Sequence, residues 1–166
     1  ANFTRESELT DAHGGAAVRG VAFAGSDSVV ATVGDDGQAR TWHCKAAQIT
    51  FESAAGESPA LCIAFGVAGG QPSLAVGYAD GRAHLWRLTG ESVALNGHTA
   101  PVLGVDFSSE GSSRYVASAS ADGTARLWSS ADGACVAVLR PPTAGVCHQV
   151  RFGVVRTRDL VVVATA

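Results

Sequence analysis

Three copies of one short phrase recur along the chain, and each copy runs from an Asp-Gly pair to a tryptophan six residues after the aspartate. Successive copies are 44 and 42 residues apart, and a phenylalanine lies 13 to 15 residues ahead of each Asp-Gly pair and recurs once more near the end. The residues of this register are Asp36, Asp80 and Asp122, then Trp42, Trp86 and Trp128, then Phe23, Phe65, Phe107 and Phe152. A repeat of about 40–45 residues is the length of one propeller blade of four strands.

Each repeat divides into four short runs that have the pattern of β-strands. In the third repeat these runs are "VLGVDFS", "YVASAS", "GTARLWS" and "ACVAVLR", and most are rich in β-branched residues or alternate bulky with small side chains. Gly, Ser, Asp and Pro gather at the joints, where they favour tight turns. No segment carries a sustained helical period of apolar residues. The sequence therefore predicts an all-β chain of four-stranded antiparallel blades.

The strand count predicts a single segment, 1–166, that makes up an incomplete propeller ring of about 3.5 blades out of about seven. Its parts are expected at 11–53, 56–95 and 97–140 for three whole blades, 144–166 for a partial blade, and 2–10 for the outer strand of a preceding blade. Because propellers close into rings, the remaining blades are expected from the same chain or from another subunit.

Composition excludes several classes of function. Charged residues make up 16% of the chain and the formal net charge is −3, so the overall charge of the chain does not attract nucleic acid. No stretch approaches the roughly 18 apolar residues of a membrane span. The four cysteines form no C-x-x-C motif, so we expect no metal site. We expect a reducing, intracellular location, with the cytoplasm first and the nucleus or an endoplasmic-reticulum-associated location as the alternatives. No nucleotide-binding motif is present, and we expect no cofactor.

Four polar residues surround the turn of the third repeat: His98, Ser118, Asp122 and Trp128. They can form one buried chain of hydrogen bonds, in which the indole N–H donates to the serine hydroxyl and the aspartate accepts from the histidine. Every polar group of such a chain has a partner, as burial requires.

The other two repeats differ in this respect. The first carries the corresponding set: His13, Thr32, Asp36 and Trp42. The second has Val76 at the Ser/Thr position and no histidine ahead of Pro59. We therefore expect packing, rather than a polar chain, to hold the second blade.

The whole pattern resembles the WD-repeat family of β-propellers, whose repeats run from a Gly-His pair to a Trp-Asp pair. The third repeat, "GHTAPVLGVDFSSEGSSRYVASASADGTARLW", carries the resemblance best. The final aspartate is replaced in every copy, by His43, Arg87 and Ser129. The resemblance implies a propeller fold, gives the polar sets a structural role, and implies that partners bind at the loops.

Some of these residues could also be assigned a chemical role. Ser118, His98 and Asp122 have the residue types of a hydrolase triad, but a nucleophile needs an exposed oxygen beside an oxyanion hole. We expect this serine to be locked beneath a tryptophan, so no catalytic residue and no enzyme activity are predicted. The adjacent pairs His43-Cys44 and Cys147-His148 lack a second pair at ligand spacing, so neither predicts a metal site.

The face expected to bind a partner is the rim formed by the loops that enter each first strand and by the turns between second and third strands. Spacing from the repeated residues places seven side chains on this rim: Arg19, Asp35, Leu61, Ala79, Leu103, Ala121 and His148. One basic, one acidic and one titratable side chain among small apolar ones suit a protein or peptide better than a polyanion.

The leading functional hypothesis is a non-catalytic scaffold for protein–protein interaction within an intracellular multiprotein complex. A second hypothesis is regulation of a small GTPase, because "VRFGVVRTRDLVVVATA" resembles a blade of the exchange factor for the COPII-coat GTPase. A third is a reader of modified peptides or RNA, although the acidic balance and the lack of basic clusters with aromatics disfavour RNA. A hydrolytic enzyme has the least support.

Overall fold

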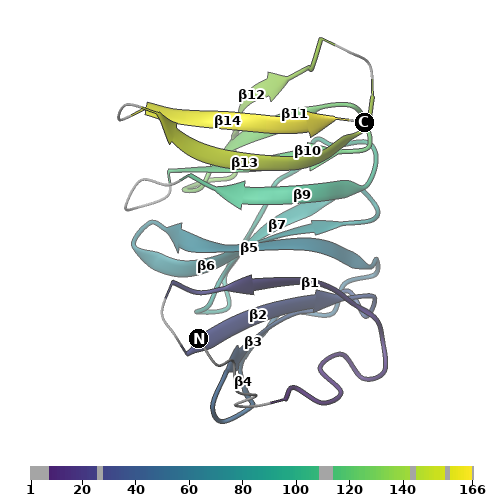
Figure 1. Cartoon of the computed structure of the whole chain (residues 1–166), viewed down its shortest axis with the longest axis vertical. Coiled ribbons are helices and arrows are strands. Elements are labelled where there is room, and N and C mark those ends of the chain that lie inside the picture. The colour runs from purple at the N-terminus through teal and green to yellow at the C-terminus, as the bar shows by residue number, and fades with distance from the viewer. Residues whose placement is uncertain (1–7, 26–27, 109–113, 143–144, 156–157, 166) are drawn as a thin grey trace, which may run out of the picture.

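The described part of the chain consists of strands, turns and loops, with no helix (Figure 1). The structure is a computed structural model, and it describes residues 8–165 apart from 26–27, 109–113, 143–144 and 156–157. Three four-stranded antiparallel sheets and a two-stranded one follow one another along the chain. This arrangement confirms the prediction of an all-β propeller segment.

Each sheet is a meander in which consecutive strands are neighbours. The first sheet contains β1 (Val18–Phe23), β2 (Val29–Gly34), β3 (Ala39–His43) and β4 (Gln48–Glu52). The second contains β5 (Ala60–Ala68), β6 (Gln71–Tyr78), β7 (Ala83–Arg87) and β8 (Ser92–Ala94). The third contains β9 (Val102–Phe107), β10 (Tyr115–Ser120), β11 (Ala125–Ser129) and β12 (Cys135–Leu139). The fourth contains β13 (Cys147–Val155) and β14 (Arg158–Thr165).

The four sheets are stacked face to face in chain order. Figure 1 shows their first strands, β1, β5, β9 and β13, side by side, and contacts join each of these strands to the next. The ring is open in the described part of the chain, because the first and last sheets lie at opposite ends of the stack. This openness agrees with the predicted incomplete ring.

The Asp-Gly pairs form the turns between the second and third strands of the three whole sheets. The glycines have positive φ angles, 72° at Gly37, 89° at Gly81 and 80° at Gly123, which residues with a side chain disfavour. In each turn the aspartate carboxylate accepts a hydrogen bond from the backbone N–H two residues later, at 2.8–3.1 Å. These turns set the register that pairs Trp42 with Val30, Trp86 with Leu74, and Trp128 with Val116.

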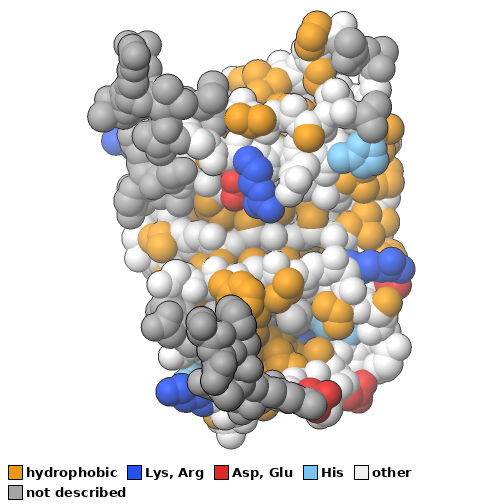
Figure 2. All heavy atoms as spheres, in the orientation of Figure 1, with side chains coloured by type: hydrophobic (Ala, Val, Ile, Leu, Met, Phe, Trp, Pro, Cys, Tyr) orange, Lys and Arg blue, Asp and Glu red, His pale blue; other side chains and the backbone are white. Residues whose placement is uncertain are grey.

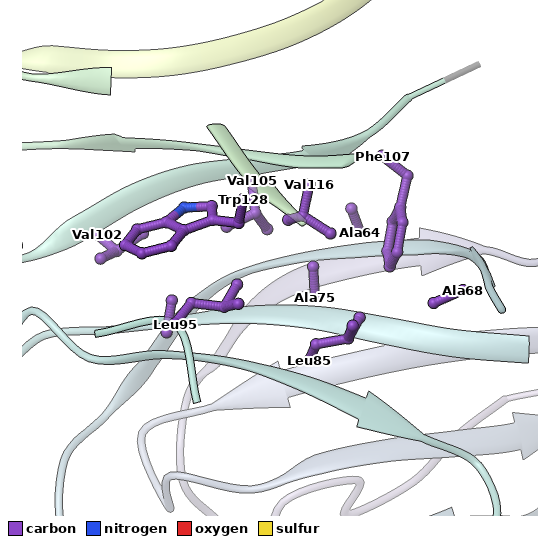
Figure 3. Packing of buried hydrophobic residues seen from close by; sticks show 11 residues of the cluster. Ala64, Ala68, Ala75, Leu85, Leu95, Val102, Val105, Phe107, Val116 and Trp128 are labelled. Atoms are coloured by element: carbon purple, nitrogen blue, oxygen red, sulfur yellow. The ribbon is translucent and has the colours of Figure 1, made fainter. Parts of the chain in front are cut away.

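The core lies between neighbouring sheets rather than at one centre. Figure 3 shows Phe107 and Trp128 of the third sheet packed toward the second, where Ala64, Ala75 and Leu85 lie. One face of the contact is bulky and the other is mostly small, so the two faces interdigitate. Similar clusters join the first sheet to the second and the third to the fourth. Each sheet therefore depends on its neighbours for most of its apolar burial, as in other repeat proteins.

Neither end of the predicted segment forms a whole four-stranded sheet in the described part of the chain. Most of the outer strand predicted at 2–10 lies outside the described residues, and residues 8–10 belong to no strand. The partial blade predicted at 144–166 contains two strands, which pair from Cys147 with Thr165 to Val155 with Arg158. No helix among the described residues could cross a membrane.

Candidate functional site

The polar residues of the third repeat form one connected chain inside the third sheet. The indole N–H of Trp128 donates to Ser118 Oγ at 2.8 Å, and His98 Nε2 lies 2.7 Å from the same oxygen. His98 Nδ1 lies 2.8 Å from Asp122 Oδ2. With the proton of a neutral His98 on Nδ1, the serine donates to Nε2 and the aspartate accepts from Nδ1. Each member then has a partner within the fold.

The electrostatics of this chain follow from its burial. Burial opposes the charge on Asp122, but hydrogen bonds from Thr124, His98 and two backbone N–H groups outweigh it and lower the pKa of the carboxyl to about 2. Burial lowers the pKa of His98, which outweighs the opposite effect of Asp122. The chain therefore pairs an ionised aspartate with a neutral histidine near neutral pH.

The first sheet contains an equivalent chain. Trp42 Nε1 donates to Thr32 Oγ1 at 2.9 Å, and His13 connects that oxygen to Asp36 at 2.9 and 2.7 Å. Arg40, which the sequence reading did not single out, donates to Asp36 Oδ2 at 2.6 Å and closes the outer side of the set. The sequence did contain a signal for Arg40, because an arginine two residues before the tryptophan recurs in the third repeat as Arg126. The Cζ atom of Arg126 lies 5.8 Å from the centroid of the Trp128 ring.

The second sheet replaces the polar chain with aromatic contacts. Val76 is fully buried at the Ser/Thr position, and the indole N–H of Trp86 instead reaches the Tyr78 hydroxyl at 3.4 Å. His84 stacks on Trp86 with ring centroids 5.7 Å apart, and Tyr78 meets His84 edge-on at 5.9 Å. Neither Tyr78 nor His84 is recognisable from the sequence, because neither occupies a position of the repeated polar set.

The missing histidine of the second sheet leaves a cavity in its place. Equivalent hydrogen bonds to the carbonyls of Pro59 and Pro101 align the two entry loops, and this alignment puts Gly56 where the third sheet has His98. A cavity of about 270 Å³ opens there, lined by Ala54, Ala55, Gly56, Glu57, Tyr78, Arg82, His84 and Trp86. The cavity therefore combines small loop residues with one wall of aromatic rings.

The cavity offers a defined chemistry. His84 Nδ1 is buried and has no hydrogen-bond partner among the described residues, and burial lowers the pKa of this imidazole. At the mouth, Arg82 pairs with Asp80 at 2.6 Å and approaches Glu57 at 3.9 Å. An aromatic wall, one unpaired polar atom and charged groups at the mouth suit an apolar or amphipathic side chain of a peptide.

The seven predicted rim residues lie at one edge of the stacked sheets. Arg19, Leu61, Leu103 and His148 are each the second residue of a first strand. Asp35, Ala79 and Ala121 each follow a second strand, and their N–H groups donate to the entry loops at 2.9–3.0 Å. Arg19 and Asp35 form a two-bond ion pair at 2.7 and 2.6 Å. The N–H of Ala79 donates to the carbonyl of Pro59, which directly follows the loop that lines the cavity. The rim and the cavity are therefore contiguous.

The catalytic and metal-binding alternatives meet physical obstacles. Ser118 has no exposed surface, and its oxygen is engaged by Trp128 and His98, so it cannot meet a substrate. Within the described ranges, no three His, Cys, Asp or Glu side chains lie close enough together to hold a metal ion.

Comparison with known proteins agrees with the geometry of the sheets. Two stretches, residues 5–43 and 91–129, match the family model described as "WD domain, G-beta repeat". These matches confirm the resemblance to WD repeats for the first and third copies. No curated protein matches the chain in sequence.

Two solved structures are similar to the chain in fold. The crystal structure of the computationally designed Ika4 protein has a TM-score of 0.72 at 21% identity, over 91% of this chain and 92% of that one. The computationally designed Ika8 protein has a TM-score of 0.74 at 22% identity, over 90% of this chain and 43% of that one. The chain thus spans less than half of Ika8. At these identities the likeness concerns the fold alone.

Proposed function

We propose that this chain, which carries WD40 repeats at residues 5–43 and 91–129, is a non-catalytic protein-binding scaffold of an intracellular complex. Repeats of this kind generally mediate protein–protein interactions. The partner binds at the rim, where a side chain of the partner enters the cavity beside Trp86.

The cavity is the observation that carries this proposal. The first and third sheets fill the equivalent space with His13 and His98, whereas the second sheet leaves it open against three aromatic rings. Aromatic residues at a partly open, concave place are typical anchors for a partner's side chain.

The rest of the rim supports a protein partner rather than nucleic acid. The Arg19 guanidinium is already paired with Asp35, and the remaining predicted rim positions are Leu, Ala and His. The net charge of −3 also opposes binding to a polyanion. The four free thiols fit a reducing compartment, so we propose a cytoplasmic location.

A selection from a peptide-display library against the whole chain tests the proposal. Ala55→Trp places a large ring in the mouth of the cavity, and Ala46→Trp adds the same ring to the exposed turn between β3 and β4. Selected peptides are expected to bind the wild type and Ala46→Trp alike, and Ala55→Trp at least about tenfold more weakly. If no peptide binds, or if Ala55→Trp binds as well as the control, the proposed site is wrong.

A further inference from the structure

The outer face of the first sheet exposes residues whose equivalents in the other sheets are buried or half-buried. Val18, Val21 and Phe23 are 51%, 58% and 75% exposed. Figure 2 shows apolar side chains at the surface over β1 and β2. The register residues equivalent to these three are buried or half-buried in contacts between sheets: Ala60, Ile63 and Phe65, then Val102, Val105 and Phe107, then Cys147, Val150 and Phe152.

The outer face of the last sheet has the opposite shape. Gly153 of β13 is the register equivalent of Gly66 in β5. A Cβ at Gly66 would overlap the ring of Phe107, whereas no described residue lies within 4 Å of a Cβ built at Gly153. Val162 of β14 is 52% exposed, while its equivalent Ala117 is buried between the third and fourth sheets. Among the described residues, the place at Gly153 is thus open where the second sheet accepts a phenylalanine, and we call this place the Gly153 notch.

The one charged side chain described on this second face, Arg151, does not disrupt its shape. The guanidinium lies 3.6 Å from Asp106 of the neighbouring third sheet. Asp106 also accepts a hydrogen bond from the backbone N–H of Phe152 at 2.8 Å. The described face therefore carries no unpaired charge that would oppose apolar docking.

We propose that a second copy of this chain docks head to tail on these faces, with Phe23 of one copy in the Gly153 notch of the other. The second copy is the occupant because the chain carries both halves of a contact that it already makes three times between its own sheets. Two such contacts place eight sheets around one axis, within the four to eight blades of known rings. This surface is separate from the rim cavity and does not depend on the proposed function.

Head-to-tail docking makes a prediction that distinguishes it from other modes. Phe23→Asp disables one face and Gly153→Asp disables the other, so each variant alone is expected to lose the dimer. Phe23 is mostly exposed and no described residue lies within 4 Å of a Cβ at Gly153, so both variants are expected to keep the fold of the single copy. A mixture of the two variants retains one intact contact and is expected to form a mixed dimer.

The test is analytical ultracentrifugation of the whole chain across a wide concentration range, with circular dichroism as a check of folding. The wild type is expected to form a dimer whose dissociation constant rises about thirtyfold or more in either single variant, the size of a hot-spot loss. Val136→Asp, on a 52% exposed apolar residue of β12 outside both faces, is the control and is expected to stay dimeric.

Three outcomes would overturn the proposal. A wild type that stays monomeric at every concentration shows that something other than a second copy covers these faces. A dimer that Phe23→Asp disrupts and Gly153→Asp leaves intact is face to face rather than head to tail. A failure of the mixed variants to associate when each is folded excludes the proposed pairing of the two faces.

Discussion

Trp128 donates the hydrogen of its indole nitrogen to the hydroxyl of Ser118, 2.8 Å away on the neighbouring strand, with both side chains fully buried. The same oxygen lies 2.7 Å from His98, so one small hydroxyl joins two large rings. A buried donor that loses its acceptor costs more than the hydrogen bond itself contributes.

Ser118→Ala removes the oxygen that joins these two rings. It is expected to lower the free energy of unfolding by about 2–3 kcal/mol, because an indole N–H and an imidazole nitrogen are left buried without partners. Urea denaturation measures the change. Ser92→Ala, at an exposed position of β8, is the control and is expected to change stability by less than about 0.5 kcal/mol. Equal effects of the two substitutions would contradict the account of the polar chain.

Tyr78→Phe removes the hydroxyl that faces Trp86 in the second sheet. That contact is long, 3.4 Å, and the ring of Tyr78 keeps its packing in the variant. The loss of stability is therefore expected to stay below about 1 kcal/mol, smaller than that of Ser118→Ala. A loss as large as that of Ser118→Ala would mean that a hydrogen bond, rather than packing, holds the second sheet.

The Asp122 carboxyl makes stability depend on acid. Its pKa is about 2 in the folded chain and about 3.9 in an unfolded one, so its stabilising effect is complete above about pH 5 and is lost as the pH falls toward 2. The loss amounts to about 2.5 kcal/mol. Denaturation curves at a series of pH values are expected to show a shallower acid slope for Asp122→Asn than for the wild type. Glu91→Gln, an exposed carboxylate, is the control, and a slope unchanged by Asp122→Asn would contradict the assignment.

Gly66→Ala tests the close contact between the second and third sheets. The added methyl group would overlap the ring of Phe107, which is buried in the cluster between the two sheets. The expected loss is about 1–3 kcal/mol, measured as a fall in the midpoint of thermal unfolding. Gly25→Ala, where a Cβ meets nothing within 4 Å, is expected to leave the midpoint nearly unchanged. A tolerated Gly66→Ala would show that the sheets are not packed this closely.

The regular part of the structure could be predicted from the sequence because each repeated position occurs three times along the chain. Asp122, Trp128 and their equivalents recur at fixed spacing, and that spacing places the turns, the strands and the members of both polar chains. The chemistry of those residues then follows from burial, since a buried indole N–H and imidazole need partners.

The cavity could not be predicted in the same way, because it forms where the second repeat differs from the others. The sequence shows that a histidine is missing ahead of Pro59, but it does not show whether the chain closes over the space. Tyr78 and His84 line the space from positions that carry no repeated signal. The exposure of Phe23 was likewise hidden, since the same register position is buried or half-buried in the following sheets.

The indole N–H signals of the three tryptophans in a nuclear magnetic resonance spectrum test the central claim most directly. Each of the three whole sheets contains one tryptophan, and only Trp86 borders the cavity. When a peptide selected for binding is titrated into the isotope-labelled chain, the Trp86 signal is expected to shift progressively while those of Trp42 and Trp128 stay in place. A Trp86 signal that does not move while the peptide binds would contradict the proposal that the partner binds at this cavity.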